Sequence, residues 1–590
     1  MRVPSKPEKK SAKRASRHVL ITLVATPKAS EGTLLRPKPH ETGFLRHRQH
    51  IVSPVIRNEM AHRDDNELTV DKKAVEEALI NMIIVDCQPF SFVEDTGFRK
   101  LIQAFDPTYV LPTRQTLKAM VEERYQQAKE KAQELVAKSS AVSITADMWT
   151  SINTDAYLAV TGHFIDEHTS LHSAVLGVLH FPDRHTAENM AAVKSALMAQ
   201  WGISTKVTCL VTDGAANMAA CAKDLHLRHT ICVAHTLNLI VKKALAENTE
   251  LSEICLQCRR IVGYFKSSTT AKTRLTQVQE QMKPTEHVLK LIQEVETRWN
   301  STFHMLQRMY YLKEAVGAAL AGLHTDITPL TSHQLRLISE SLQVLSPFND
   351  ATVELSEEKR VSGSKVIPLL AMLHHTLEDD MGAIQMEESK AMAEGLKKQL
   401  RDKLYNLQAM SVMSLATLLD PRFKKIGFFS PNKAQEAERR LTAECAAVIR
   451  HRASSSLSSS NPSSSTQPDT SEGSQPVEQG DKLWRRLDHT VMQRRTQSRT
   501  QSESADATVE VHTYLGEPNT SRKSNPLDYW EQHKHIYPNL YKLAITLLCT
   551  PASSVPCERV FSKAGEILSK KRNRLKPKTL EMLIFLNKNE

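Results

Sequence analysis

The stretch Ala141-Val-Ser-Ile-Thr-Ala-Asp147 decides how we expect this chain to fold, because an apolar, strand-like run leads into an aspartate. A second run, Val207-Thr-Cys-Leu-Val-Thr-Asp213, has the same form, and Val555-Pro-Cys-Glu558 adds a glutamate near the end of the chain. Carboxylate oxygens are the ligands that Mg²⁺ prefers, and a pair of such ions serves phosphodiester chemistry. The three acids therefore predict a polynucleotidyl transferase site, provided that the fold brings them together.

Each of these acids also has an ordinary structural explanation. An aspartate after a strand often caps the next helix, and a helical glutamate is usually a solvated surface residue. In the second run, however, Val207, Cys209, Val211 and Asp213 share one face of a strand by the period of two. A bare carboxylate that continues an apolar face is unfavourable unless it is paired or bound to metal. Taken together, the three acids favour metal binding.

The segments around the two aspartates predict the fold class. Strand-like runs cover residues 141–149, 157–165 and 171–181, with short polar turns between them, which indicates an antiparallel meander. Thr186 is a plausible N-cap for a helix that reaches Trp201, and residues 206–212 form a fourth strand. This order predicts an α/β fold with a ribonuclease-H-like core.

The rest of the sequence is mostly helical. Val75, Ala78, Leu79, Met82 and Ile83 make one helical stripe, residues 98–105 make a second helix, and a third runs from Thr113 to about Lys138. We expect a disordered basic tail (1–65), a small helical DNA-binding or dimerisation-like module (66–140), the first part of the core (141–245), a large all-helical insertion (246–452), a low-complexity linker (453–524) and a helical C-terminal region that completes the core (525–590).

Bulk composition limits the class of protein. A chain of 590 residues is too long for one core, and its nine scattered cysteines indicate a reducing compartment rather than a disulfide scaffold. No apolar run approaches the ~18 residues that cross a bilayer. Residues 1–63 hold 14 Lys/Arg and 4 Asp/Glu, so they could be a nuclear localisation signal, a nucleic-acid arm, a solvated tail or, less readily, a mitochondrial presequence.

The C-terminal segments resemble the dimerisation region of hAT-superfamily transposases. The resemblance rests on Asn525-Pro-Leu-Asp-Tyr-Trp530, Pro551-Ala-Ser-Ser-Val-Pro-Cys-Glu-Arg-Val-Phe-Ser-Lys-Ala-Gly565 and Leu583-Ile-Phe-Leu586. Thr145-Ala-Asp147-Met-Trp149 and Thr212-Asp213-Gly-Ala-Ala-Asn217 resemble the aspartate motifs of the same superfamily. From about Val70 onward the chain resembles the vertebrate zinc-finger BED proteins.

The resemblance implies roles for particular residues. Asp147, Asp213 and Glu558 would be the catalytic acids and the ligands of Mg²⁺ or Mn²⁺, while Cys232 and His235 match a Cys-x-x-His structural motif. The resemblance further implies that Arg298 and Trp299 bind DNA, with the tryptophan stacking on a flipped base. It also implies a homodimer or higher homo-oligomer that acts on DNA in the nucleus, with no membrane and no small-molecule substrate.

Simpler explanations stand beside these roles. Cys232 and His235 supply only two metal ligands, so packing and a structural hydrogen bond explain them better than zinc. A helical tryptophan such as Trp299 is by default a core or interface anchor. The apolar C-terminal stripe exceeds what such short helices can cover alone, and we expect part of it to dimerise. The residues concerned are Leu540, Leu543, Leu547, Phe561, Leu583, Ile584 and Leu586.

The chain departs from the zinc-finger BED pattern at its start. The first cysteine is Cys87, so residues 1–70 contain no Cys/His finger. The missing finger favours a protein that is no longer a transposase, whereas the retained triad favours catalysis. We expect a hAT transposase-derived nuclear protein that self-associates through its C-terminal region and retains an Asp-Asp-Glu triad for metal-dependent DNA cleavage and strand transfer. The alternative is a domesticated, catalytically silent, dimerising DNA-associated transcriptional regulator.

Overall fold

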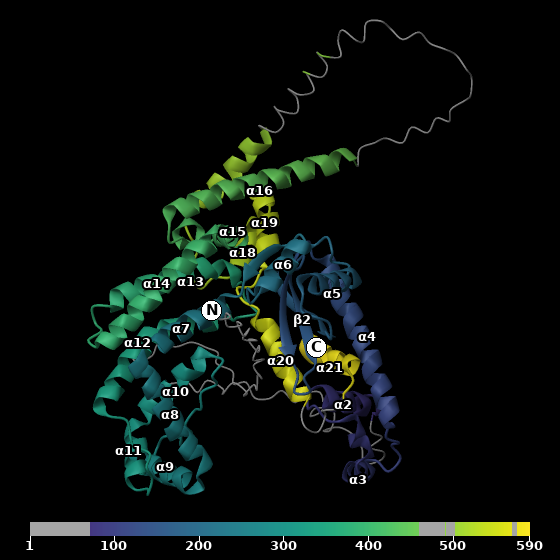
Figure 1. Cartoon of the computed structure of the whole chain (residues 1–590). Helices are drawn as coiled ribbons and strands as arrows, with labels where there is room; N and C mark the ends of the chain where they lie inside the picture. Colours follow the sequence, from purple (N-terminus) through teal and green to yellow (C-terminus); the bar gives the residue numbers. More distant parts are fainter. Residues whose placement is uncertain (1–70, 459–485, 487–489, 491–501, 569–574) are drawn as a thin grey trace, which may run out of the picture. The chain divides into compact units, whose positions relative to one another are not determined.

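The computed structural model describes residues 71–458, 486, 490, 502–568 and 575–590 (Figure 1). The expected basic tail and most of the expected linker lie outside these residues. The described chain is mixed α/β and mostly helical, with two compact units. One unit contains residues 129–561, and the other contains residues 71–128 and most of the segment after 561. Each unit is considered by itself.

A five-stranded sheet forms the α/β part of the first unit. Its strands are β1 (Val142–Thr150), β2 (Ala156–Ile165), β3 (Leu171–His180), β4 (Val207–Thr212) and β5 (Arg228–Ile231). The strand order is β3-β2-β1-β4-β5, in which β1 and β3 pair with β2 antiparallel, and β4 pairs with β1 and β5 parallel. The predicted meander and fourth strand are confirmed, whereas β5 was missed because its four residues include the polar Arg228, His229 and Thr230.

Two helices follow strands of this sheet. Helix α5 (Ala187–Gln200) begins where expected, because the Thr186 hydroxyl accepts a hydrogen bond from the Asn189 amide. At its end, Trp201 Nε1 donates to the Leu176 carbonyl at 2.9 Å, which fixes α5 against β3. Helix α6 (Ala216–Asp224) comes directly after β4 and the Asp213 turn, so β4 is linked to the parallel strand β5 through a helix.

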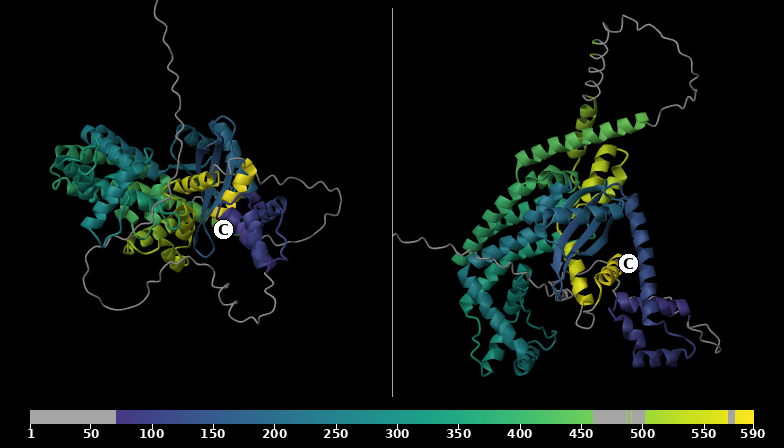
Figure 2. Two further views of the ribbon diagram at one scale, coloured as in Figure 1. Left: turned by 90° about the horizontal axis from the view of Figure 1, so that it is seen from below. Right: turned by 45° about the vertical axis from the view of Figure 1, so that its right-hand side comes forward.

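Residues 233–458 are helical apart from short connections, as the sequence indicates. Figures 1 and 2 show these teal and green helices gathered into one block. One large core cluster joins side chains from residues 233–413, including the buried Leu237, Phe303, Leu345 and Leu396. The helices are α7 (Val233–Glu247), α8 (Thr249–Ser267), α9 (Thr269–Met282), α10 (Trp299–Tyr311), α11 (Lys313–Ala321), α12 (Ser332–Leu355), α13 (Val366–Asp380), α14 (Glu387–Ala409), α15 (Ser411–Leu419) and α16 (Pro431–Ser458).

The expected linker over 453–524 is wrong at its C-terminal end. Residues 502–516 are helical, and Ala507, Val511 and Tyr514 are buried at intervals that place them on one helical face. Tyr514 also donates its hydroxyl to the Leu418 carbonyl at 3.0 Å, so this helix belongs to the core. Regular structure therefore resumes before Asn525, and continues in α18 (Pro526–His533), α19 (Pro538–Leu548) and α20 (Val555–Ile567).

The second unit brings the two ends of the described chain together. It contains α2 (Lys72–Ile84), a 3₁₀ turn (Phe90–Glu94), α3 (Thr96–Phe105), the first part of α4 (Arg114–Lys138) and α21 (Pro577–Asn589). The ring of Phe585 on α21 meets Tyr125 on α4 edge-on at 5.1 Å between centroids. Asn587 donates to the Ile84 carbonyl at 3.1 Å, so α21 also contacts the end of α2.

The residues predicted to dimerise are buried within the chain itself. Leu540, Leu543, Leu547 and Phe561 are at most 7% exposed, and Leu583, Ile584 and Leu586 are fully buried. Folding within one chain already covers this stripe, so a part that faces a partner stays a prediction. Ile536 of the same region is 62% exposed.

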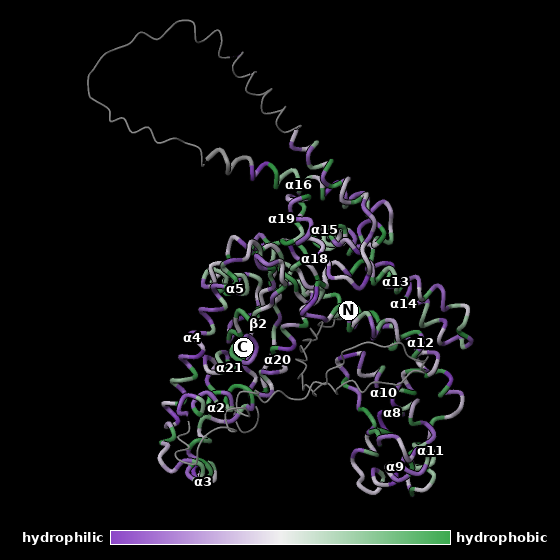
Figure 3. Tube along the Cα trace, turned by 180° about the vertical axis from the view of Figure 1, so that it is seen from behind, coloured by the Kyte–Doolittle hydropathy of each residue, from purple (hydrophilic) through white to green (hydrophobic). Residues whose placement is uncertain are grey.

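Along the described helices, hydrophobic and hydrophilic residues alternate (Figure 3). None of these helices is long and apolar enough to cross a membrane.

Candidate functional site

Asp147 and Asp213 lie side by side on neighbouring strands. In the parallel pairing of β1 with β4, Thr145 is the partner of Val211. Continuing this register by two residues sets Asp147 beside Asp213, which directly follows β4. Paired residues of adjacent strands lie about 5 Å apart and share a face of the sheet. The first two predicted acids are therefore brought together, and Asp147 lies within β1 rather than at its end.

Helix α20 carries Glu558 onto the same face. Cys557 Sγ lies 3.0 Å from Thr145 Oγ1, and the ring of Phe561 stacks on Trp149 at 5.8 Å between centroids. Thr145 and Trp149 flank Asp147 on one face of β1, just as Cys557 and Phe561 flank Glu558 on α20. The two contacts thus hold Glu558 at the level of Asp147, over a sequence separation of more than 400 residues.

The segment before α20 is fixed by the helical block. The Val233 amide donates to the Ala552 carbonyl at 3.0 Å, and the Ala552 amide donates to Ser362 Oγ at 3.1 Å. Gly363 approaches so closely that a Cβ at this position would lie 2.3 Å from the Thr550 carbonyl oxygen. These contacts determine where α20 begins, and hence where Glu558 points.

The pKa of Asp147 responds to burial and to the charges of the other two acids. Burial raises the pKa of Asp147 from 3.8 to about 7, although a hydrogen bond from the Met148 amide at 2.8 Å acts in the opposite direction. The negative charges of Glu558 and Asp213 raise this pKa further. A carboxyl that is half-buried beside two others holds its proton near neutral pH unless a cation compensates the charge.

In this conformation an arginine provides part of that compensation. Arg298 Nη2 donates to Glu558 Oε2 at 2.6 Å, and the two side chains are 46% and 31% exposed. Among the described residues, the only group of three or more ligand atoms within 4.8 Å of one another is His374, His375 and Glu378. The acids Asp147, Asp213 and Glu558 are therefore near one another but do not form a closed cation cage while Arg298 holds Glu558.

The Arg298–Trp299 pair sits at the start of α10. Asn238 on α7 accepts a hydrogen bond from the Trp299 amide at 3.0 Å and donates to the Thr297 carbonyl at 3.3 Å, which fixes the turn that presents Arg298. Trp299 is 1% exposed and meets the ring of Phe303 edge-on. Its predicted base stacking stays a prediction, which requires the indole to leave this core position.

Cys232 is the N-cap of α7. Its thiol is fully buried and accepts a hydrogen bond from the His235 amide at 3.4 Å. Burial raises the pKa of this thiol to about 11, which keeps it protonated at neutral pH. Burial likewise raises the pKa values of Cys255 and Cys258 of α8 to about 12. These thiols therefore contribute to packing and capping.

The sequence analysis named Arg298 but missed its partner, and it missed Asn238 altogether. The pairing of Arg298 with Glu558 spans 260 positions, and no local pattern indicates it. Asn238 shares its helical face with the polar residues His235 and Lys242, so no local signal singled it out.

Four family models match parts of the chain. Residues 510–590 match the hAT family C-terminal dimerisation region, and residues 145–240 match the ZBED1 RNase-like domain. Residues 230–342 match the ZBED1 RNase-like helical domain, and residues 68–106 match the Hermes transposase DNA-binding domain. Together these models account for the sheet, part of the helical block and both ends of the described chain.

Curated relatives match over most of the chain. Zinc finger BED domain-containing protein 4 of Homo sapiens is 27% identical over 554 residues, which is 89% of this chain and 44% of that protein. The Putative AC transposase of Zea mays is 26% identical over 530 residues, which is 85% of this chain and 63% of that protein. The chain thus spans less than two thirds of the length of each of these two relatives.

Proposed function

Since this chain belongs to the hAT family and is similar to the zinc finger BED domain-containing proteins, we propose that it is a transposase-derived nuclear protein that cleaves DNA and transfers strands at Asp147, Asp213 and Glu558. The observation that carries the proposal is the convergence of these three carboxylates on one face of the sheet, where two of them raise the pKa of the third. Self-association through residues 510–590 is part of the same proposal.

The strand order supports a ribonuclease-H-like core. Three antiparallel strands precede a helix, and two parallel strands follow, with one acid within β1 and another at the end of β4. In this view the helices after residue 245 interrupt the core as an insertion, and α20 returns to complete it. The hydrogen bond between Val233 and Ala552 supports this view, because it joins the chain just before the insertion to the chain just before α20.

The donor set suits Mg²⁺ or Mn²⁺, because all three side chains offer hard oxygen ligands. Divalent ions bound there would activate the attacking hydroxyl and stabilise the leaving oxygen of a phosphodiester. Asp147 must lose its proton to act as an anionic ligand, and a cation that binds Glu558 Oε2 displaces Arg298. The freed guanidinium is then available to a DNA phosphate, which it can bind bidentately.

Cleavage in the presence of Mn²⁺ tests the catalytic part. Full-length protein is incubated with DNA that carries its flanking genomic ends, and strand breaks and joined products are resolved on a denaturing gel. We expect products from the wild type and none from Asp147→Asn, Asp213→Asn or Glu558→Gln. Asp224→Asn is the matched control, since Asp224 is an exposed acid at the end of α6 and outside the site. If wild type and triad variants produce the same products, or none, the proposal is refuted.

Light scattering tests self-association separately. We expect a mass of at least a dimer at micromolar concentration, whether or not the catalytic acids are present. A monomer under these conditions would contradict the assignment of residues 510–590 to dimerisation, and would leave the cleavage result to be judged by itself.

A further inference from the structure

A large cavity lies in the first unit, and none of the three acids lines it. Its volume is about 960 Å³. Three segments line it: the turn between β2 and β3 (residues 168–171), the chain around residues 354–365 together with Arg422, and the chain over residues 522–532. The cavity is polar, and the family-model comparisons assign no role to it.

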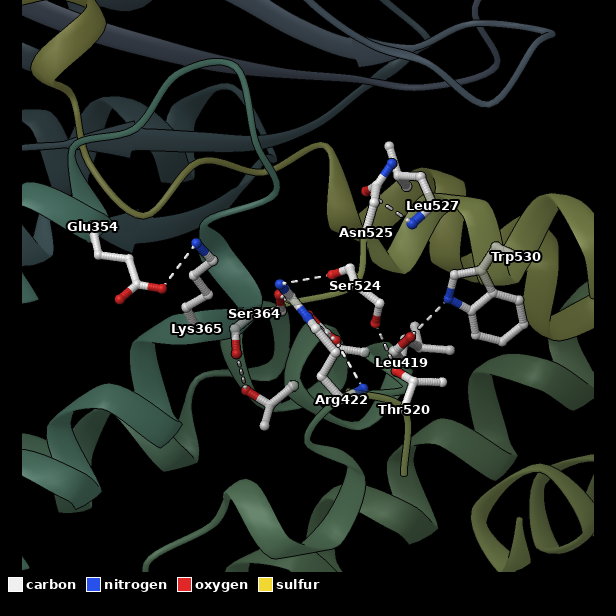
Figure 4. Close-up of polar contacts among 12 residues, drawn as sticks. Glu354, Ser364, Lys365, Leu419, Arg422, Thr520, Ser524, Asn525, Leu527 and Trp530 are labelled. Atoms are coloured by element: carbon white, nitrogen blue, oxygen red, sulfur yellow. Dashed lines mark hydrogen bonds and ion pairs between the residues drawn. The ribbon is translucent and has the colours of Figure 1, made fainter. Parts of the chain in front are cut away.

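Two cations in the cavity wall are buried and already paired. Lys365 has a side chain that is 6% exposed and lies 3.1 Å from Glu354 and 3.3 Å from Glu357. Arg422 is also 6% exposed and pairs with the fully buried Asp420 at 2.6 Å. Figure 4 shows Lys365 pointing toward Glu354 and Arg422 pointing toward Ser524. Each of these two cations is compensated by its own partner, and removing that partner would leave a buried charge uncompensated.

Four further cations around the cavity have no such partners. Lys359, Arg360, Arg522 and Lys523 are exposed, and within the described chain their side chains have no ion pair or hydrogen bond that would neutralise them. The lining acids do not offset them, because Glu354 is held by Lys365 and Glu531 by Lys534 at 2.5 Å.

This leaves an excess of positive charge around a concave wall. Asp528 is the remaining lining acid, and it accepts a hydrogen bond from the Asn525 amide group at 2.8 Å. Like charges around one hollow repel one another and focus a positive potential into it. An anion in the cavity would relieve this repulsion.

The N-terminus of a helix also borders the cavity. Asn525 caps this end of α18 by accepting a hydrogen bond from the Leu527 amide at 3.2 Å. The positive end of the helix dipole suits the negative charge of a phosphate. The volume falls within the ~300–1,000 Å³ range of small-molecule sites, whereas a duplex is too wide to enter a cavity of this size.

We propose that this cavity binds a small ligand with several phosphate groups, of the nucleoside triphosphate or inositol polyphosphate class. Arg522 and Lys523 face such a ligand from one side, and Lys359 and Arg360 face it from another. Because these residues come from segments more than 150 positions apart, the bound ligand would link the helical block to the C-terminal region. The ligand would thus stabilise the first unit without being a substrate of the DNA reaction.

Calorimetric titration of the full chain tests this proposal with three probes: ATP without divalent cations, inositol hexakisphosphate, and a 20-base-pair DNA duplex. We expect at least one of the two small phosphates to bind. Arg522→Glu/Lys523→Glu should weaken its binding by at least about tenfold, because two attractive charges are replaced by two repulsive ones. The matched control is Arg260→Glu/Lys272→Glu, which reverses two exposed cations outside the cavity. This control should bind within about twofold of wild type.

The relative response to the two small phosphates distinguishes a nucleotide from an inositol polyphosphate. Equal weakening by the two double variants would mean non-specific attraction and would overturn the proposal. So would the absence of binding at millimolar concentration, or binding of the duplex alone. Because all four substituted cations are exposed, we expect both variants to keep the melting temperature of wild type without ligand. An unfolded Arg522→Glu/Lys523→Glu variant is replaced by Lys359→Gln/Arg360→Gln, for which the same outcomes apply.

Discussion

The substitution Arg298→Gln probes how the arginine controls the acidic site. In this conformation Arg298 Nη2 donates to Glu558 Oε2 at 2.6 Å, so the guanidinium competes with a cation for this oxygen. Both side chains are partly exposed, so the pair contributes about 0.2–1 kcal/mol. Its loss should therefore tighten Mn²⁺ binding by up to about fivefold, since 1.4 kcal/mol corresponds to tenfold in affinity.

The chain offers a closely matched control for this experiment. Arg559 is adjacent to Glu558 in sequence but pairs with Glu358 at 2.9 Å, and these side chains are 44% and 29% exposed. Arg559→Gln removes the same charge from an ion pair of the same kind that does not involve the triad. We expect it to leave Mn²⁺ affinity within about twofold of wild type.

Calorimetric titration of the DNA-free protein with Mn²⁺ measures this difference. Removal of DNA matters, because Arg298 could otherwise contribute through a phosphate contact. If Arg298→Gln binds Mn²⁺ no more tightly than Arg559→Gln, Arg298 does not compete with the metal, and our account of the Arg298–Glu558 pair is wrong.

Three further predictions follow from the described contacts. Because the pKa of Asp147 is raised to about 7, the folded state keeps a proton that the unfolded state loses near pH 4. Without metal, the free energy of unfolding should therefore fall as the pH rises from about 4 to about 7. Asp147→Asn should make the melting temperature less dependent on pH over this range. Gly363→Ala should lower the free energy of unfolding measured in urea by about 1–3 kcal/mol, because the added Cβ would meet the Thr550 carbonyl oxygen. The control Gly395→Ala adds a Cβ in open space on α14 and should not lower it. Equal effects of the two substitutions would contradict the close approach of Gly363 to Thr550. Cys232→Ala should lower the free energy of unfolding measured in urea by about 1 kcal/mol, because it removes the side chain that caps α7. Cys232→Ser keeps a side chain that can accept the same hydrogen bond, so most of the wild-type stability should remain. Equal losses for the two variants would show that the cap is unimportant.

The sheet and its flanking helices could be predicted from sequence because their signals are local. Alternation along residues 157–165 and the Thr186 cap each depend on neighbours within one element. The short strand β5 and the helix over 502–516 were missed for different reasons. The four residues of β5 are too few to show alternation, and the 502–516 helix follows directly after a polar stretch that dominates the composition.

The sequence predicted which acids belong to the site, but not how their side chains are paired and packed. The two aspartates follow from strand patterns, and the resemblance to hAT transposases points to Glu558. The pairing of Glu558 with Arg298, and the burial of Trp299, depend on how α7, α10 and α20 pack, which no local pattern records. The burial of Leu583 and Ile584 on α21 was missed for the same reason, since this helix contacts α2 and α4, which lie more than 400 residues earlier in the chain.

Anomalous diffraction from crystals grown with Mn²⁺ tests most directly whether three distant carboxylates form one metal site. Our account predicts an anomalous peak at about 2 Å from oxygens of Asp147 and Asp213, with Glu558 turned from Arg298 toward the ion. A strong peak only at His374, His375 and Glu378, or none at Asp147 while Arg298 keeps its contact with Glu558, would contradict it.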